Sequence, residues 1–352
     1  MTAPDNPPAS SSGPEGRFAR QTRFAPLGAR GQAELASARV LIVGCGALGG
    51  VLAQWLTRAG VGHLTLVDRD IVEETNLPRQ VLFTAENARA GAPKAHAAKD
   101  ALGTIGGPTE IEAHAVHLDA KVLGDLGRGQ DLILDGTDNM STRYLINDSC
   151  VQNGTPWIYG GVVSGAGLVM PILPGSGPCL RCIFRDPPPP GTLPTCDTAG
   201  VIGPAVGAIA SMQAGLALRI LGGQDAPEAG LLEIDVWNGH VRRLGVPRDP
   251  ACPCCGSREF TFLDEAEVTD AVSLCGRNTV QVLPAAGSPR PDSSALVARL
   301  IESGIDARAA GPLVRFEADA CRFTLFPDGR TLVEGTEDTG RAQALVSRWI
   351  GQ

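Results

Sequence analysis

Residues 39–49 read Arg-Val-Leu-Ile-Val-Gly-Cys-Gly-Ala-Leu-Gly, and this stretch decides the fold. Its first part, residues 39–43, is a short apolar run that predicts a buried strand, and the apolar spacing through residues 52–59 predicts a helix soon afterwards. The turn between them carries a Gly-x-Gly-x-x-Gly pattern, formed by Gly44, Gly46 and Gly49. Glycines in this context let the backbone approach a phosphate at the N-terminus of the helix. The stretch therefore predicts a nucleotide-binding unit of strand, loop and helix.

Strand and helix patterns keep alternating after this unit. The sequence predicts strands at 63–67, 111–116, 131–134 and 157–159, and helices at 94–102 and 142–152. Such alternation is typical of a doubly wound, mostly parallel sheet with helices on both faces. We therefore expect an α/β fold for the main part of the chain.

The composition divides the chain into three segments. Residues 1–16 are rich in Pro, Ser and Gly and are expected to form a flexible tail. The main α/β domain is expected over 17–263, with an exposed loop where four prolines follow one another at 187–190. A small α+β module is expected over 268–352. Its predicted elements are strands at 279–283, 313–317, 322–326 and 331–334, and helices at 294–302 and 339–350.

Charge and hydropathy argue against two classes of partner. The 352 residues carry 30 Lys and Arg against 38 Asp and Glu, and no basic run matches the phosphates of a nucleic acid. An uncharged run at 198–218 is long enough for a membrane, but Pro204 suits the first turn of a buried helix that runs to about Leu221. The N-terminal tail lacks the pattern of an export signal. We therefore expect a cytoplasmic protein that binds neither nucleic acid nor membrane.

Charged residues follow the predicted strands at the sheet edge where ligands bind. Asp68 ends the 63–67 strand and is placed to bind a ribose, so the loop and Asp68 alone make NAD the default ligand. Arg79, Lys94 and Asp138 add two cations and a carboxylate, which suit phosphoryl or nucleotidyl transfer with Mg²⁺. The alternatives are solvated surface charges for the two cations and an N-cap of the next helix for Asp138.

Four of the ten cysteines form two pairs with metal-ligand spacing, Cys179 with Cys182 and Cys252 with Cys255. This Cys-x-x-Cys…Cys-x-x-Cys pattern predicts a closed, tetrahedral Zn²⁺ site with a structural role. A redox couple at the first pair would leave the second pair unexplained, and Cys254 is an alternative ligand to Cys255. Four other thiols are expected to be buried small apolar residues: Cys45, Cys150, Cys275 and Cys321.

Several motifs in a fixed order give the chain a resemblance to a known family. They are Arg20-Gln21, the glycine loop at 44–50, Asp68-x-Asp70 with Asn76-Leu-x-Arg79-Gln80, Pro93-Lys94, Asp135-Gly-Thr-Asp-Asn139, the paired cysteines, and Thr195-Cys-Asp-Thr-Ala-Gly-Val201. With them the chain resembles, from about residue 17 to 256, the E1-like adenylyltransferases of the MoeB, ThiF and HesA family, relatives of ubiquitin-activating enzymes. The resemblance implies the Rossmann-like fold of an E1 adenylation domain, a homodimer, and ATP with Mg²⁺ as cofactors.

The resemblance also implies a reaction and its partners. The reaction is ATP-dependent adenylation of the C-terminal glycine carboxylate of a small ubiquitin-like sulfur-carrier protein that ends in Gly-Gly. This step activates the carrier for sulfur transfer in thiamine synthesis, molybdopterin synthesis or tRNA thiolation. A sulfurtransferase is the expected downstream partner.

By resemblance, individual residues receive roles in this reaction. Asp68 would bind the ribose, Arg79 and Lys94 the triphosphate, and Asp138 the Mg²⁺. Three further residues would provide supporting contacts around them: Asp70, Asn76 and Gln80.

Two more residues of the family pattern would act elsewhere: one in the nucleotide pocket of the partner chain, and one on the carrier. Arg20 would reach ATP across the dimer interface, and its alternative is an ordinary charge of the N-terminal segment. Cys196 would bond covalently to the activated carrier or to sulfur, and its alternative is an inert loop thiol.

Two other classes of function stay open at the level of sequence. One is an NAD-dependent oxidoreductase that uses the same glycine loop, although the cations and the paired cysteines argue against it. The other is a non-enzymatic scaffold that binds carriers through the module after Val268. The module lies outside the resemblance, and we expect it to dock the carrier or a sulfurtransferase.

Overall fold

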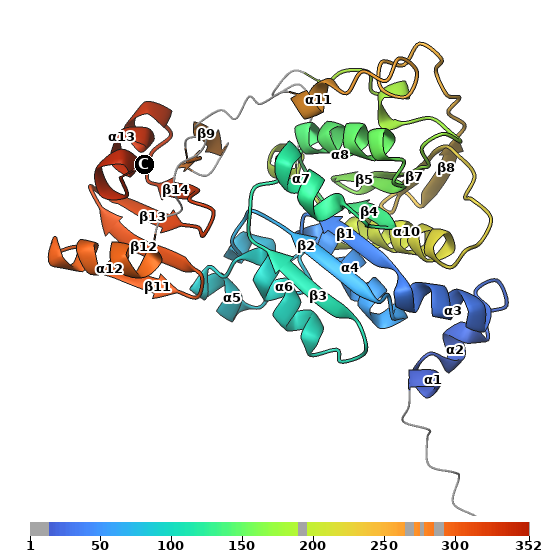
Figure 1. Cartoon of the computed structure of the whole chain (residues 1–352), viewed down its shortest axis with the longest axis horizontal. Helices are drawn as coiled ribbons and strands as arrows, with labels where there is room; N and C mark the ends of the chain where they lie inside the picture. The colour runs from blue at the N-terminus through green and yellow to red at the C-terminus, as the bar shows by residue number, and fades with distance from the viewer. Residues whose placement is uncertain (1–13, 189–195, 265–270, 275–277, 285–291, 352) are drawn as a thin grey trace, which may run out of the picture.

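The computed structural model describes residues 14–188, 196–264, 271–274, 278–284 and 292–351. They form a large body around an eight-stranded sheet and a smaller body around a six-stranded sheet (Figure 1). Most of the expected tail, the second half of the four-proline run and Cys275 lie outside the described residues. The described chain begins with two single-turn helices, α1 (Pro14–Arg17) and α2 (Ala19–Thr22).

The large sheet confirms the expected doubly wound, mostly parallel architecture. Its strand order is β3-β2-β1-β4-β5-β6-β7-β8. Strands β1 to β5 pair in parallel, and β6, β7 and β8 continue the sheet in antiparallel fashion. The strands are β1 (Arg39–Val43), β2 (His63–Val67), β3 (Glu110–His114), β4 (Leu132–Asp135), β5 (Trp157–Val163), β6 (Ala166–Ile172), β7 (Leu231–Asp235) and β8 (His240–Leu244). The chain switches sides of the sheet between β1 and β4, which is where ligands bind in such folds.

Helices cover both faces of this sheet. One face carries α4 (Ala47–Ala59), α6 (Lys94–Gly103) and α10 (Gly203–Leu221), and the other carries α7 (Ala120–Gly127) and α8 (Met140–Asn153). In β1, Val40 and Ile42 belong to the first core, whereas Leu41 and Val43 belong to the second. All four side chains are buried. The strand has no polar alternation because both of its faces are covered.

Most of the uncharged run at 198–218, which is long enough to cross a membrane, lies in helix α10. Among the described residues it alone is long and apolar enough to cross a membrane, and 44% of its most apolar window is buried within the protein. It packs against α4, β5 and β6. Its Gln213 side chain donates to the carbonyls of Asp135 at 2.9 Å and Ile158 at 3.2 Å. These are the contacts of a core helix.

The smaller body is an antiparallel sheet with two helices packed against its core. The strand order is β11-β12-β13-β14-β10-β9. Leu296 and Leu300 of one helix and Ala342 and Val346 of the other share a core with the strands. The elements are β9 (Ala271–Leu274), β10 (Thr279–Val282), α12 (Ser293–Glu302), β11 (Ala307–Ala310), β12 (Leu313–Ala318), β13 (Cys321–Leu325), β14 (Thr331–Glu334) and α13 (Thr339–Trp349). This agrees with the expected α+β module and adds β9 and β11.

Several short elements are not predicted by the sequence patterns. They include α3 (Gly28–Ser37), η1 (Glu74–Asn76), α5 (Ala85–Ala90), η2 (Leu180–Cys182), α9 (Cys196–Ala199) and α11 (Thr261–Asp264), and the longer elements α7 and β6 are also missed. Helix α3 buries few positions, chiefly Gly31 and Leu35, so it lacks a wide apolar stripe. The strand predicted at 111–116 is β3, which begins one residue earlier and ends at His114; the His114 carbonyl accepts the N–H of Asp68, next to the last pair of the ladder with β2.

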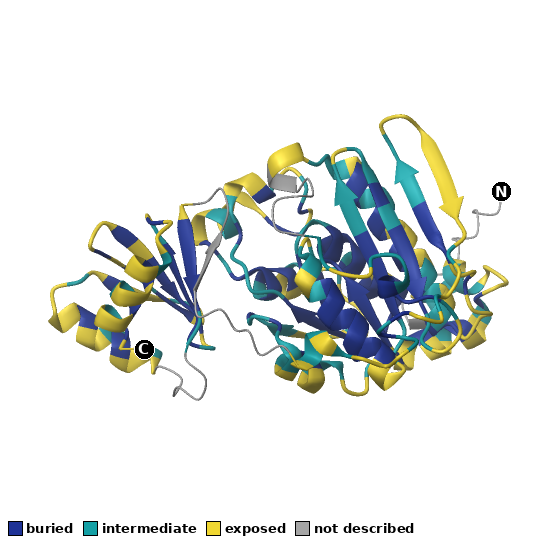
Figure 2. Ribbon diagram, turned by 90° about the horizontal axis from the view of Figure 1, so that it is seen from above, coloured by how far each residue is buried: buried dark blue, intermediate teal, exposed yellow. Residues whose placement is uncertain are grey.

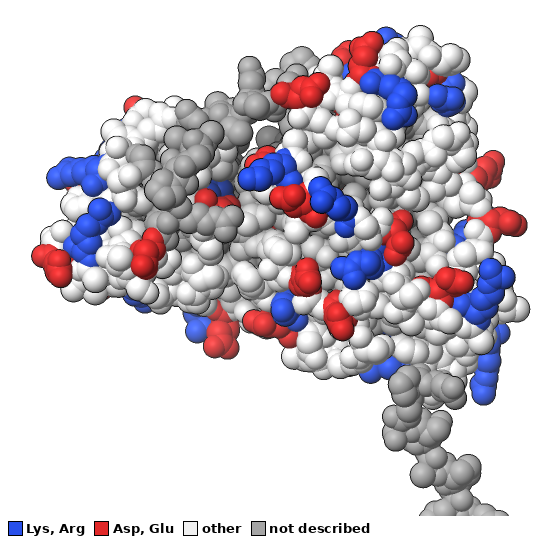
Figure 3. Space-filling model, in the orientation of Figure 1, with Lys and Arg blue, Asp and Glu red and all other residues white. Residues whose placement is uncertain are grey.

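The surface includes one fully exposed strand and carries charges of both signs. Strand β8 is exposed along its whole length at the edge of the large sheet (Figure 2). Basic and acidic side chains are intermixed over the face of the molecule shown in Figure 3.

Candidate active site

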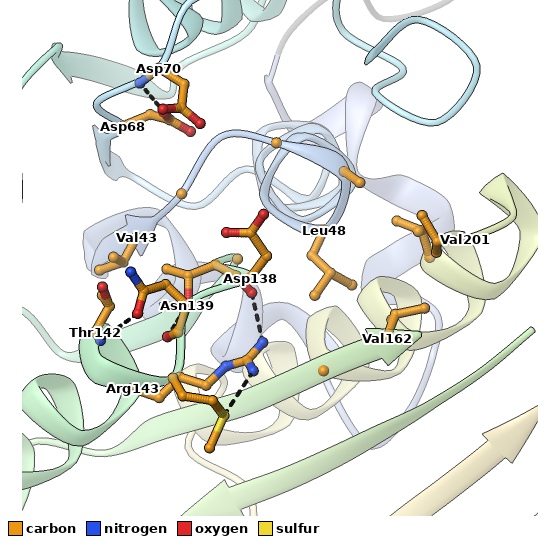
Figure 4. Close-up of a pocket in the computed structure, with 18 of the residues that line it drawn as sticks. Val43, Leu48, Asp68, Asp70, Asp138, Asn139, Thr142, Arg143, Val162 and Val201 are labelled. Atoms are coloured by element: carbon orange, nitrogen blue, oxygen red, sulfur yellow. Dashed lines mark hydrogen bonds between the residues drawn. The ribbon is translucent and has the colours of Figure 1, made fainter. Parts of the chain in front are cut away.

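A cavity of about 490 Å³ opens at the carboxyl ends of β1, β2, β4 and β5 (Figure 4). This volume lies within the usual range for small-molecule sites. Asp68 and Asp70 lie at one end of the view, Val162 and Val201 lie at the other, and Asp138 lies between them. The cavity therefore joins a charged end to an apolar end at the switch point of the sheet.

The glycine loop forms the floor of the charged end. Gly44 has a φ of +88°, and a Cβ there would lie 2.7 Å from the carbonyl oxygen of Gly136. A Cβ on Gly49 would lie 1.8 Å from the carbonyl oxygen of Gly44, so this glycine allows α4 to pack against the loop. Gly46 precedes α4 and lines the cavity. The helix N-terminus thus faces open space where a phosphate can bind.

Asp68 holds the two loops that meet at this end. Its Oδ2 accepts the backbone N–H of Cys45 at 2.6 Å, and its Oδ1 accepts that of Asp70 at 2.7 Å. Burial raises the pKa of Asp68, and Asp70 adds to the rise, whereas Lys94 and the two backbone hydrogen bonds oppose it. A cationic or hydroxyl-bearing ligand that adds donors here would offset part of the burial cost.

Lys94 is an internal cation of the cavity wall. Its side chain is 6% exposed, and its Nζ lies 3.1 Å from Asp70 Oδ2. Burial alone would lower the pKa of Lys94, but Asp70 and Asp68 outweigh it and raise the pKa. The alternative of a solvated surface charge is therefore wrong for Lys94. Arg79 is half-buried, lines the same cavity, and donates to the carbonyl of Thr75 at 2.7 Å.

Asp138 is exposed at the cavity rim and does not cap a helix. The N-cap of α8 is Asn139, whose Oδ1 accepts the N–H groups of Ser141 and Thr142. The N-cap alternative for Asp138 is therefore wrong. Its carboxylate is therefore accessible to a cation such as Mg²⁺ that enters the cavity with a phosphate.

Sequence reasoning missed Arg143, which lies on the cavity wall. Its Nε donates to Asp135 Oδ2 at 2.8 Å, and its Nη2 donates to the carbonyls of Thr137 at 2.7 Å and Gly160 at 2.9 Å. The burial of this cation is compensated, because Asp135 and the neighbouring groups raise its pKa overall. Arg143 thus ties β4 to β5 beneath the cavity. The only signal in the sequence was a cation one turn into a helix that follows an acidic strand end.

The remaining residues of the family pattern fall at different places. Gln80 lines the cavity, whereas Asn76 does not: its Oδ1 accepts the N–H of Glu73 and shapes the turn that carries Arg79. Arg20 is exposed on α2 and does not line the cavity of its own chain. Cys196 begins α9, and its side chain lies outside what the structure describes.

The four cysteines of the two pairs come together on the face of the sheet that carries α7 and α8. Their sulfur atoms all lie within 4.8 Å of one another. The separations are 4.0 Å for Cys179–Cys182, 3.5 Å for Cys179–Cys252 and 3.4 Å for Cys182–Cys255. A tetrahedral zinc site with Zn–S bonds of about 2.3 Å separates its sulfurs by about 3.8 Å. The donor set and its spacing fit such an ion.

Cys254 lies beside this cluster, where its thiol contacts both Cys179 and Asp148. Its Sγ accepts a hydrogen bond from Asn147 Nδ2 at 3.2 Å, while Asn147 Oδ1 accepts the N–H of Leu180 at 2.9 Å. Beside it, Arg181 pairs with the buried Asp148 at 3.2 Å. The four sulfurs that all lie within 4.8 Å of one another nevertheless include Cys255 and not Cys254. Cys45, Cys150 and Cys321 are buried, as expected for small apolar residues.

The cavity brings a glycine loop at a helix N-terminus together with an acidic residue after β2, two cations and a further carboxylate, and these groups suit nucleotidyl transfer. A family model described as "ThiF family" matches residues 18–254. The chain belongs to the ThiF family, and it is an E1-like adenylyltransferase.

The chain is also similar to individual known proteins. The chain is 40% identical to the sulfur carrier protein ThiS adenylyltransferase of Bacillus subtilis, covering 96% of this chain and 99% of that one. It is 38% identical to the adenylyltransferase and sulfurtransferase MOCS3 of Mus musculus, covering 87% of this chain and 66% of that one. A crystal structure of E. coli MccB with ATP has the same fold, with a TM-score of 0.59, 23% identity, and coverage of 68% of this chain and 74% of that one.

His117, which also lines the cavity, generates a pH prediction. Burial, together with the nearby charges of Arg69 and Arg330, lowers the pKa of His117 from 6.5 to about 4. The unfolded chain gains this proton near pH 6.5 but the folded chain only near pH 4, so the stability contributed by the neutral ring is lost as pH falls between these values. Between pH 7 and pH 5 we expect the parent to lose about 2 kcal/mol more free energy of unfolding than a His117→Gln variant.

Denaturant titrations at both pH values would measure this difference. His240→Gln, in the exposed strand β8, is the matched control and should behave as the parent does. Equal losses in the parent and in His117→Gln would contradict the prediction.

Proposed function

We propose that the chain adenylates the C-terminal glycine carboxylate of a ubiquitin-like sulfur-carrier protein. One observation carries the proposal: Lys94, Arg79 and Asp138 line one cavity together with the glycine loop. The names of the relatives agree with it, since the Bacillus subtilis protein is named for a sulfur carrier. The same cavity disfavours an NAD-dependent oxidoreductase, because hydride transfer needs no cations around the phosphates.

The chemistry follows from the charges. A carboxylate is a poor electrophile, and joining it to AMP gives an acyl phosphate with a good leaving group. The carboxylate oxygen attacks the α-phosphorus, the bond to the β-phosphate oxygen breaks, and pyrophosphate leaves with that electron pair. Lys94 and Arg79 lie where they can stabilise the charge that builds on the phosphate oxygens. Asp138 would hold Mg²⁺, which neutralises phosphate charge when bound.

The apolar end of the cavity suits the tail of a carrier. It is lined by small or apolar residues from β5, β6 and α10 and the segment before α10: Gly161, Val162, Val163, Ala166, Gly167, Val201 and Val206. Side chains this small leave room along the wall for an extended chain, and Leu168 and Glu233 complete the lining at this end. A Gly-Gly terminus would therefore reach the glycine loop with its carboxylate foremost.

Removing the two cations tests the proposed reaction. An Arg79→Gln, Lys94→Met double variant should lose at least about 100-fold in carrier-dependent ATP–pyrophosphate exchange, because two groups that stabilise the transferred phosphate are gone. Lys121→Gln, a cation on α7 away from the cavity, should exchange at the parent rate. The measurement uses carriers that end in Gly-Gly, with a carrier lacking the last glycine as a blank.

Unchanged exchange in the double variant would contradict the proposed roles. Reduction of NAD without any ATP requirement would instead favour the oxidoreductase. Carrier binding without any nucleotide turnover would favour the scaffold.

A homodimer with Arg20 supplied by the partner chain is the second part of the proposal. It is supported by the family pattern and by the position of Arg20, which is exposed on α2 outside its own cavity. If the partner supplies this residue, Arg20→Ala and Lys94→Met should each be inactive alone. Refolded as a mixture, they should regain about a quarter of the parent exchange rate, because half of the dimers are mixed and each mixed dimer holds one complete site.

If activity does not recover on mixing, each chain does not supply Arg20 to the site of its partner. Full activity of the Arg20→Ala variant alone would contradict its role altogether.

Structural Zn²⁺ at the four cysteines is the third part. The sulfur separations support it, and Cys179, Cys182, Cys252 and Cys255 would hold the ion. Cys255→Ser should lose the metal and melt at a lower temperature, because three sulfurs leave the site open. Cys254→Ser is the matched control, and it should keep one zinc per chain by elemental analysis. Retained zinc in Cys255→Ser with loss in Cys254→Ser would reverse the assignment.

A further inference from the structure

The C-terminal module packs directly against the loop that follows β2. Ile71 of this loop packs on Leu313, Phe326 and Leu332 of the module. A second contact lies at α5, where the Arg315 guanidinium donates to the carbonyls of Ala90 and Gly91 at the helix end. In Figure 1, β11 and β12 lie beside α5. The module is thus fixed to the nucleotide-binding half of the large body.

Arg330 is the innermost residue of this contact. It follows the turn between β13 and β14, and its side chain is 0% exposed. Its Nη2 donates to the carbonyl of Arg69, and its guanidinium lies 3.5 Å from the ring centroid of Phe326. Asp328 Oδ2 lies 3.7 Å from its Nε. Burial lowers the pKa of Arg330 to about 10, so the group is still charged at neutral pH.

The Arg69 carbonyl and the Asp70 N–H belong to one peptide group. Arg330 binds the oxygen of this group, and Asp68 Oδ1 binds its hydrogen at 2.7 Å. Because a peptide group is planar, fixing its oxygen also fixes the direction of its N–H. We infer that Arg330 is a positioning residue of the nucleotide site, which sets the orientation of the Asp68 carboxylate through the Arg69–Asp70 peptide.

A second contact of the same turn supports this assignment. Asp328 Oδ2 accepts the backbone N–H of His117 at 3.4 Å, and the ring atom Nδ1 of His117 lies 3.3 Å from Arg69 Nη1. His117, Arg69, Asp68 and Asp70 all line the cavity, whereas Arg330 stands directly behind them. The turn therefore supports the back of the cavity wall at two points. The inference rests on the nucleotide role proposed for Asp68.

The test compares two arginines that dock the module. In the full chain, Arg330→Met removes the donor but keeps an apolar stem, whereas Arg315→Met removes the contact at α5 and leaves the Arg69–Asp70 peptide untouched. A hydrogen bond from a charged donor is worth a factor of about 10 or more in an equilibrium. We expect Arg330→Met to weaken ATP binding in calorimetry by about 10-fold and Arg315→Met by less than about 2-fold. Arg330→Lys, which restores a donor, should recover part of the loss.

Hydrogen exchange gives a readout that does not depend on turnover. The amide of Asp70 should exchange about 10-fold faster in Arg330→Met than in the parent, and at the parent rate in Arg315→Met. Equal effects of the two variants on ATP binding would overturn the inference, because docking of the module as a whole would then be responsible. Parent-like binding and exchange in Arg330→Met would also overturn it.

Asp68→Asn separates this inference from the proposed function. If Asp68→Asn binds ATP as the parent does, the nucleotide role of Asp68 is wrong and the inference fails with it. If Asp68→Asn weakens ATP binding but Arg330→Met does not, only the inference fails. Should Arg330→Met not fold, Arg330→Gln, which leaves the Arg69 carbonyl without a charged donor, takes its place in the comparison with Arg315→Met.

Discussion

The two backbone hydrogen bonds to the Asp68 carboxylate are the interaction on which the rest of the site depends. They join the glycine loop at Cys45 to the loop after β2 at Asp70. Asp70 in turn holds Lys94, the buried cation of the cavity. The result is a chain of alternating charges and dipoles whose members are oriented before any ligand arrives, and such preorganisation is what makes electrostatic stabilisation effective.

The sequence predicts those parts of the site that are carried by local spacing. Gly44, Gly46 and Gly49 reveal the loop because a tight turn and a close helix need glycine at fixed offsets. The cysteine pairs reveal a sulfur cluster for the same reason, since two Cys-x-x-Cys units suit one tetrahedral ion. The alternation of apolar strands and amphipathic helices likewise predicts the doubly wound sheet, because covered parallel strands need continuous apolar runs.

What the sequence leaves hidden depends on contacts between distant residues. Arg143 reads as an ordinary helix cation, and only the fold shows that it joins Asp135 to the carbonyl of Gly160. Gln213 reads as a polar interruption of an apolar helix, yet it bonds to two strand-end carbonyls. Arg330 belongs to another body altogether and meets Arg69 across 261 positions of sequence. No spacing rule links such pairs, since their partners are set by how the elements pack.

The sulfur cluster has a consequence for the chain that lies between its two halves. Cys179 and Cys252 are 73 positions apart, and the segment between them includes α10, β7 and β8. Any ion held by the four sulfurs would close this segment into a ring. The four sulfurs come together only when this segment is folded, so the free energy of metal binding would add directly to the free energy of unfolding. Removal of the ion by a chelator would therefore loosen the connection between the two ends of a segment that supplies the edge strands of the large sheet.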